Sequence, residues 1–316
     1  MTTTLPAYLE AARARVDRAL DRVLPSAPAC PPVIAEAMRY SVFAGGKRLR
    51  PILTLAAADA VGLSATDEDN DLALPAACAI ELIHTYSLIH DDLPAMDNDT
   101  LRRGRPTLHV VYGDGIAVLA GDGLHAEAFR LLAREPATED PEIMRRKLRV
   151  TQTIGDAASA MGMVGGQAID LQATGGGSRG HVRSDAPAQA DVATLEHMHA
   201  CKTGALIRAA SVAGAIMAGG SDDEVTRIDR YAAMLGLAFQ IVDDILDVEG
   251  SAATLGKTTG KDAAEQKPTY VALFGLERSR QMANECAERA RRELAAANLT
   301  SGWLAPIVDW VIGRKN

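Results

Sequence analysis

The chain has 316 residues, of which 47% are hydrophobic and 23% are charged. This composition is ordinary for a globular protein and argues against extensive disorder. The net charge of -8 argues against general nucleic-acid binding, which takes most of its affinity from a basic surface. The 4 cysteines are scattered and lack the close spacing of a disulfide framework or a zinc site.

Targeting signals are not evident in the sequence. Residues 1–10 lack the basic start and apolar run of a secretory signal, and no segment reaches about 18 uninterrupted apolar residues. We therefore expect a cytoplasmic protein without a membrane span.

Alanine, leucine and arginine dominate the chain, and alternating runs of Val, Ile and Thr are rare. We therefore predict an almost entirely α-helical fold. The expected helices cover residues 4–23, 32–43, 49–61, 72–92, 108–133, 142–160, 192–218, 223–248, 267–296 and 301–314. Ser221 and Glu224 form a capping box at the start of the 223–248 helix, which we expect to end in a cluster of aspartates.

The glycine-rich stretch 173–191 has no apolar period and is expected to be an exposed, mobile loop. It resembles a domain linker in composition. We interpret it as a surface insertion within a single domain spanning residues 1–316, because the motifs on either side of it must meet if they form one site.

Two aspartate clusters are the most informative feature of the chain. The first comprises Asp91, Asp92 and Asp97, and the second comprises Asp243, Asp244 and Asp247. Carboxylates packed this closely repel one another, so a fold that gathers them needs cations. Their hard oxygen atoms favour magnesium shared with phosphate. One such cluster alone is more often a solvated helix end.

Helix geometry refines this interpretation. Asp243 and Asp247 are four residues apart and lie within about 40° of each other on a helix. Asp91 and Asp97 are six apart and would diverge by about 240° on a straight helix. Pro94 lacks an N–H group and crowds the preceding turn, so we expect the helix to bulge or stop there. Such a distortion could bring Asp97 round to Asp91.

Two groups of cations accompany the aspartates. They are the stretches GGKRLRP at residues 45–51 and LRRGR at residues 101–105. Arginine donates bidentate hydrogen bonds to phosphate, lysine supplies a compact charge, and the glycines let a backbone approach closely. Together these groups indicate a diphosphate site, although each alone could be a solvated turn.

Six segments then follow one another in a recognisable order: GGKRLRP, HTYSLIHDDLPAMDNDTLRRGRPT, GGQAID, CKTGALI, GLAFQIVDDILDVEG and TLGKTTGKD. In this order they closely resemble the segments of bacterial farnesyl diphosphate synthases, from about residue 30 to the final helix. The resemblance implies a single all-α domain of long antiparallel helices around a deep central cavity. It also implies a homodimer and the head-to-tail condensation of isopentenyl diphosphate with dimethylallyl and geranyl diphosphate to give farnesyl diphosphate.

The resemblance assigns roles to individual residues. The metal ligands, for three Mg2+ ions, are Asp91, Asp92, Asp97, Asp243, Asp244 and Asp247. The residues that match isopentenyl diphosphate ligands are Lys47, Arg50, His84 and Arg103, and those that match allylic diphosphate ligands are Arg102, Lys202, Lys257 and Lys267. Gly46 is a further expected substrate-binding residue. Thr203 and Gln240 match polar groups that face the allylic cation, so the catalytic set is Lys202, Thr203, Gln240, Asp91 and Asp243.

Chain length is expected to depend on Tyr86, with its neighbour Ser87. Tyr86 lies five residues before Asp91, which is about 7.5 Å along a helix. A bulky ring there would floor the prenyl pocket, and the resemblance to the bacterial enzymes implies a fifteen-carbon product. Thr100, where relatives often have aspartate, and the long 173–191 loop depart from the pattern without removing an expected ligand.

Other interpretations remain open at this stage. A geranylgeranyl or longer-chain synthase would differ only in pocket depth. A class I terpene cyclase would carry a different second metal motif, and a silent regulatory partner would not need complete motifs. At the C-terminus, Arg314 and Lys315 could close over diphosphate or form a frayed basic tail.

Overall fold

The computed structural model describes residues 4–62, 71–173, 192–253 and 269–314. The chain divides into two compact units, which are treated separately: residues 1–154 with 210–220 form the first, and residues 155–209 with 221–316 form the second. Both consist of helices, and the only sheet among the described residues is a two-stranded hairpin in the first unit. The predicted all-α fold is confirmed. The single domain and central cavity stay predictions.

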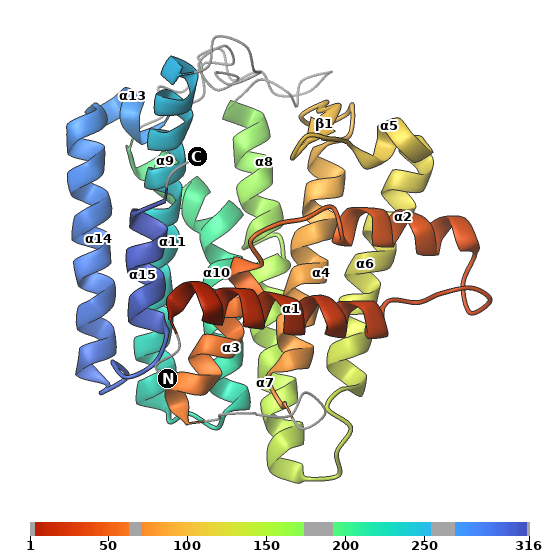
Figure 1. Cartoon of the computed structure of the whole chain (residues 1–316), viewed down its shortest axis with the longest axis horizontal. Helices are drawn as coiled ribbons and strands as arrows, with labels where there is room; N and C mark the ends of the chain where they lie inside the picture. Colours follow the sequence, from red (N-terminus) through yellow and green to blue (C-terminus); the bar gives the residue numbers. More distant parts are fainter. Residues whose placement is uncertain (1–3, 63–70, 174–191, 254–268, 315–316) are drawn as a thin grey trace. The chain divides into compact units, whose positions relative to one another are not determined.

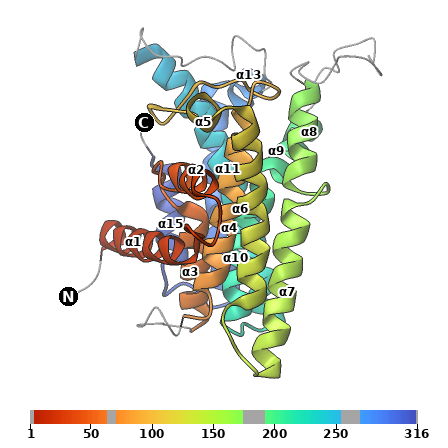
Figure 2. The ribbon, with the colours of Figure 1, turned by 90° about the vertical axis from the view of Figure 1, so that its right-hand side faces the viewer.

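The first unit is built around a long apolar helix, α4. Its described helices are α1 (Leu5–Val23), α2 (Pro32–Val42), α3 (Leu49–Val61), α4 (Leu74–Asp91), α5 (Leu108–Tyr112), α6 (Asp114–Arg134), most of α7 (Pro141–Ala158) and most of α10 (Ala205–Met217). Figures 1 and 2 show α4 beside α6, and α3 packs against α4 as well. Ile80, Ile83 and Leu124 are fully buried in this layer. The interior position of α4 explains why apolar residues surround almost its whole circumference.

The second unit centres on α11 (Asp222–Ala253), which lies beside α14 (Leu276–Ala296) and α15 (Leu304–Ile312) in Figure 1. Its other elements are α8 (Met163–Ala173), α9 (Val192–His199), the π-helical turn η2 (Ala200–Gly204), the start of α10 (Ala205–Met217) and α13 (Tyr270–Phe274). A buried cluster that includes Leu195, Ile241 and Tyr270 joins α9, α11 and α13. The predicted capping box is confirmed, because the Ser221 amide donates to Glu224 Oε2 at 2.7 Å and the Glu224 amide to Ser221 Oγ at 3.3 Å.

Glycines divide two helices that the sequence predicts as continuous. The expected 108–133 helix is α5 and α6, separated at Gly113 with a φ of 82°. The expected 267–296 helix is interrupted at Gly275 with a φ of 77°. Only glycine adopts such angles without strain, so the chain turns there.

Three further boundaries differ from expectation. The sequence does not predict α8, because the two glycines of MVGGQAIDLQA obscure its helical period. The expected 192–218 helix contains η2, a turn of π-helix. The expected 223–248 helix extends to Ala253, so the prediction that it ends in the second aspartate cluster is wrong. No helix in the described parts of the chain is long and apolar enough to cross a membrane.

Candidate active site

The first aspartate cluster lies where α4 ends. The helix stops at Asp91, and the backbone then curls so that the Asp97 amide donates to the Asp91 carbonyl at 2.8 Å. Pro94 lies within this curl and cannot continue the helical hydrogen bonds. The prediction that a break near Pro94 brings residue 97 back to residue 91 is therefore confirmed for the backbone.

Asp92 is held by an arginine of the hairpin that follows. Its side chain is buried, and Arg102 Nε lies 2.9 and 3.0 Å from its two carboxylate oxygens. Burial raises the pKa of Asp92, and the Arg102 guanidinium opposes that shift. A predicted metal ligand and a predicted diphosphate ligand are thus paired with each other.

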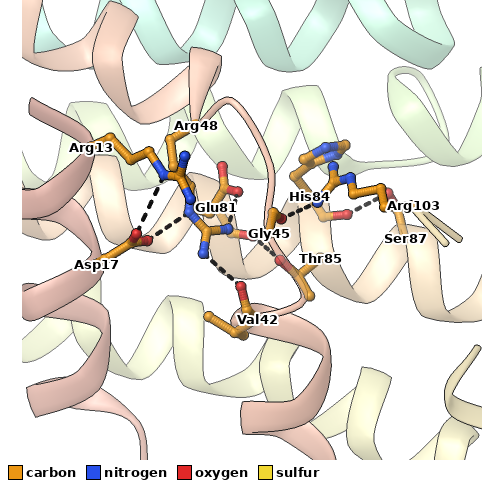
Figure 3. A network of polar contacts seen from close by, with 10 residues as sticks. All are labelled: Arg13, Asp17, Val42, Gly45, Arg48, Glu81, His84, Thr85, Ser87 and Arg103. Carbon is orange, nitrogen blue, oxygen red and sulfur yellow. Dashed lines mark hydrogen bonds and ion pairs between the residues drawn. The ribbon is translucent and has the colours of Figure 1, made fainter. Parts of the chain in front are cut away.

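The hairpin itself positions the next arginine. Strands β1 (Leu101–Arg102) and β2 (Arg105–Pro106) are joined by Arg103 and Gly104, whose φ angles are 53° and 74°. Two positive φ angles are typical of a type I′ turn. The turn directs Arg103 to the segment before α3, where its guanidinium donates a hydrogen bond to the Gly45 carbonyl (Figure 3).

Gly46 is favoured by its backbone conformation and by its contact with Arg103. A Cβ atom at residue 46 would lie 2.7 Å from Arg103 Nη1, and the φ of Gly46 is 138°. The positive φ would strain an ordinary side chain there, and the Arg103 guanidinium would have to shift to make room. The predicted site residues Gly46 and Arg103 are therefore brought together, although the backbone carbonyl that Arg103 contacts belongs to Gly45.

One cleft in the first unit is lined by four predicted ligands, which are His84, Asp92, Arg102 and Arg103. Arg48 and Glu81 line the same cleft. Lys47 and Arg50 do not line this cleft, and Lys47 is exposed. The sequence analysis missed Arg48 and Glu81, which are both buried. A lone glutamate in the apolar stretch 74–83 is the signal that could have revealed the pair, because a buried charge requires a partner.

His84 lies among arginines. Burial lowers the pKa of His84 well below its usual value, and Arg50 and Arg103 lower it further. The imidazole is therefore neutral at neutral pH and can donate a hydrogen bond without adding charge.

Tyr86 is buried on α4 and stacks on a second aromatic side chain. Its ring centroid lies 4.6 Å from that of His125 on α6, with an interplanar angle of 25°. His90 also packs edge to face with Tyr86, at a centroid distance of 5.7 Å. Ser87 donates to the His84 carbonyl of its own helix at 2.9 Å. Packing against α6 therefore fixes Tyr86 firmly, whereas Ser87 bonds within α4.

The second aspartate cluster lies within α11. Asp243 forms an ion pair with Arg314 at 2.9 Å, and the buried Asp244 accepts a hydrogen bond from the Tyr270 amide at 2.7 Å. Asp247 is exposed, one turn beyond Asp243. Arg314 also lies over the Phe239 ring at 3.9 Å, and its side chain is only 5% exposed. Arg314 is therefore not part of a frayed tail, while Lys315 falls outside the described residues.

Lys202 lies in the π-helical turn η2 and forms an ion pair with Asp170 of α8. Turns of this kind are frequent at functional sites because they displace side chains from the regular helical positions. His199 lies directly before the turn. Burial lowers the pKa of His199 to about 4, although Asp170 opposes the shift. Thr203 is half-buried in the same turn.

Lys257, Lys267 and the expected 173–191 loop, apart from residue 173, lie outside the described residues. Within the described ranges, no three His, Cys, Asp or Glu side chains are grouped as they would be around a metal ion. Asp92 and Asp244 are instead turned toward protein donors. The donors in both clusters are carboxylate oxygens, which is the chemistry that magnesium prefers.

Comparison with known proteins bears directly on these features. A sequence model of the family described as "Polyprenyl synthetase" matches residues 31–299. The chain is 44% identical to the farnesyl diphosphate synthase of Escherichia coli (strain K12) over 315 residues, covering 98% of this chain and 99% of that protein. The chain belongs to the polyprenyl synthetase family. The chain is 40% identical to the geranylgeranyl diphosphate synthase of Cyanophora paradoxa, and the match covers 98% of this chain and 96% of that protein.

A solved structure of the family supports the fold. The crystal structure of an FPP/GFPP synthase from Zymomonas mobilis superposes with a TM-score of 0.79 at 37% identity and covers 98% of each chain. The predicted family resemblance is confirmed, and the chain is a trans-prenyl diphosphate synthase. Its relatives include both farnesyl and geranylgeranyl synthases.

Proposed function

We propose that this polyprenyl synthetase makes farnesyl diphosphate from isopentenyl diphosphate with dimethylallyl and geranyl diphosphate as primers. The observation that carries the fifteen-carbon assignment is the buried ring of Tyr86, stacked on His125 at 4.6 Å. Two helices hold this ring about one and a half turns before Asp91. An immobilised aromatic ring blocks a growing prenyl chain better than a flexible side chain does.

The diphosphate groups are assigned to the two sets of cations. Lys47, Arg50, His84 and Arg103 receive isopentenyl diphosphate, and Arg102 with Lys202, Lys257 and Lys267 receives the allylic diphosphate. Neutral His84 donates a hydrogen bond, while the arginines supply charge. Thr203 and Gln240 face the allylic cation, and close placement of the two substrates favours carbon–carbon bond formation over capture by water.

The six aspartates of the two clusters would hold magnesium, which stabilises the negative charge of the departing diphosphate. We propose three ions, as the resemblance to bacterial farnesyl diphosphate synthases implies. Asp92 and Asp244 would then exchange their present partners for metal. Among the chain's own residues, the arginines and Lys202 stabilise the same charge, and the released diphosphate takes the proton lost after condensation.

A homodimer is the proposed assembly. Exposed apolar side chains on α5 and α6 support it, including Val111 at 47%, Val118 at 39% and Leu119 at 55% exposure. Apolar residues gathered on neighbouring helices commonly mark an interface. Sedimentation of the purified protein at a mass near twice 33.3 kDa would support this proposal, and a monomer would refute it.

Product analysis tests the proposed function. Purified protein is incubated with magnesium, labelled isopentenyl diphosphate and either primer, and the dephosphorylated products are separated. Farnesol from both primers supports the proposal, and Tyr86→Ala should then give longer alcohols. Tyr86→Phe serves as the matched control, because it keeps the ring and should keep farnesol. Wild-type geranylgeraniol would refute the fifteen-carbon assignment, and cyclic hydrocarbons would refute a synthase altogether.

A further inference from the structure

Arg48 joins four helices through a single buried side chain. It lies directly before α3, is 5% exposed and has a left-handed φ of 51°. Its Nε donates to Asp17 of α1 at 2.8 Å, its Nη1 to Glu81 of α4 at 2.7 Å and its Nη2 to the Val42 carbonyl of α2 at 2.6 Å (Figure 3). A non-glycine residue in this conformation persists only where its surroundings determine it strongly.

The charge of this side chain is well compensated. Burial alone would lower the pKa of Arg48, but Glu81 and Asp17 raise it above the ordinary value, so the guanidinium stays charged. Asp17 also lies 3.6 Å from Arg13, so it keeps a cationic neighbour of its own. Each nitrogen of the guanidinium has a protein acceptor, which makes Arg48 a structural contact rather than a diphosphate ligand.

The contacts of Arg48 lie between the segments that carry the proposed isopentenyl diphosphate ligands. Lys47 precedes it, and Arg50 follows two residues later. Its partner Glu81 is one helical turn before His84, and both line the same cleft as Arg48 itself. Arg103 reaches the same loop from the hairpin through the Gly45 carbonyl. Movement of residues 44–48 would therefore displace Lys47 and the acceptor of Arg103 together, relative to His84.

We propose that Arg48, with Glu81 and Asp17, is a positioning residue for isopentenyl diphosphate. The ion pair fixes the 44–48 loop to α4 and so keeps the positions of Lys47 and of the Gly45 carbonyl, which Arg103 contacts, constant relative to His84. This inference rests on the proposed function, because it takes these residues as the ligands of isopentenyl diphosphate. It assigns Arg48 no contact with substrate and no part in binding the allylic diphosphate.

The principal test replaces both buried partners in Arg48→Met/Glu81→Leu. Removing the pair leaves no unpaired buried charge, and apolar replacements of this kind often preserve folding. Direct titration with isopentenyl diphosphate gives its Kd, and steady-state assays give KM for each substrate. We expect the Kd and KM for isopentenyl diphosphate to rise by roughly tenfold or more, because displacement of about 1 Å is enough for such a loss. The KM for geranyl diphosphate should stay within about twofold.

Two further variants keep the test decisive. Glu81→Gln keeps the shape and one acceptor, so it provides a folded protein if the double variant does not fold, and it should show the same selective effect in weaker form. Arg48→Lys keeps charge but loses the fork that reaches three acceptors, so it should not restore binding.

Arg15→Met is the matched control. Arg15 is also an arginine of α1, and it forms an ion pair with the buried Asp71 in the first unit. Neither residue lines the cleft that contains His84. Its loss should reduce the urea midpoint without changing the ratio of the two KM values. Equal KM values in wild type and the folded double variant, or parallel rises for both substrates, would overturn the proposal. A wild-type protein that binds isopentenyl diphosphate but does not condense it would refute the proposed function, while the Kd comparison would still test Arg48.

Discussion

Gly166→Ala should disturb Lys202 through a contact between two backbones. Gly166 is buried in α8, and a Cβ atom there would lie 2.2 Å from the Lys202 amide nitrogen and 2.6 Å from its Cα. Ordinary contact begins near 3.4 Å, so α8 and η2 would have to separate by about 1.2 Å. The neighbouring atoms belong to a backbone, which cannot rotate away as a side chain can.

The magnitude follows from two opposing effects. Forcing an extra carbon into a packed site costs about 1–3 kcal/mol, and Ala gains up to about 1 kcal/mol over Gly within a helix. We therefore expect Gly166→Ala to lower the unfolding free energy by about 1–2 kcal/mol. Lys202 and its partner Asp170 lie on the two elements that separate, so the proposed allylic diphosphate site should lose roughly tenfold to a hundredfold in kcat/KM.

Urea unfolding and steady-state kinetics with geranyl diphosphate measure the two effects. Gly115→Ala in α6 is the matched control, because a Cβ atom there meets nothing within 4 Å. This control should leave kcat/KM unchanged and stability equal or slightly higher. A Gly166→Ala protein with wild-type stability and wild-type kcat/KM would refute the close contact between α8 and η2.

Three other predictions address stability, pH and metal. Gly214→Ala should lower the free energy of unfolding in urea by about 2–3 kcal/mol, because its Cβ would lie 1.9 Å from the Thr54 carbonyl oxygen. It should leave both KM values unchanged. An unaltered urea midpoint would contradict this contact. His199 has a folded pKa of about 4 against about 6.5 when unfolded, so the unfolded state binds the proton first and stability should fall as pH falls from about 6.5 to about 4. At pH 5 this loss of stability is about 2 kcal/mol. In His199→Gln, the difference in unfolding free energy between pH 7 and pH 5 should be smaller by this amount. An unchanged difference would show that His199 is not buried as neutral imidazole. Chelation of magnesium should stop product formation and its return should restore it, whereas full activity in excess chelator would contradict the proposed role of the aspartates.

The sequence predicted the helical class and most helix positions, because helices carry a regular apolar period. It also predicted the curl at Pro94, since proline has a definite local effect. The breaks at Gly113 and Gly275 were missed, because glycine within an apolar period can continue a helix or end it. The outcome depends on tertiary packing that the local sequence does not contain.

Motif order predicted which residues gather near the end of α4, but local patterns could not predict their partners. The Arg48–Glu81 ion pair joins positions 33 apart, and Asp92 is held by Arg102 rather than grouped with its neighbouring aspartates. Such contacts depend on how helices approach one another and on which side chains lose water in the process. Resemblance identified Tyr86, whereas its stacking on His125 required the position of α6.

Ion pairs among the candidate site residues of each unit lead us to propose that substrate binding is an exchange of partners. Asp92 pairs with Arg102, Asp243 with Arg314, and Asp170 with Lys202. In the first pair, the proposed function assigns the acid to magnesium and the arginine to diphosphate. Magnesium would replace Arg102 as the partner of Asp92, and diphosphate would replace Asp92 as the partner of Arg102. Neither charge is then left uncompensated. Either ligand alone would bind one member of the pair and leave the charge of the other member without a partner. If the proposed function holds, we expect magnesium and allylic diphosphate to bind jointly rather than one by itself.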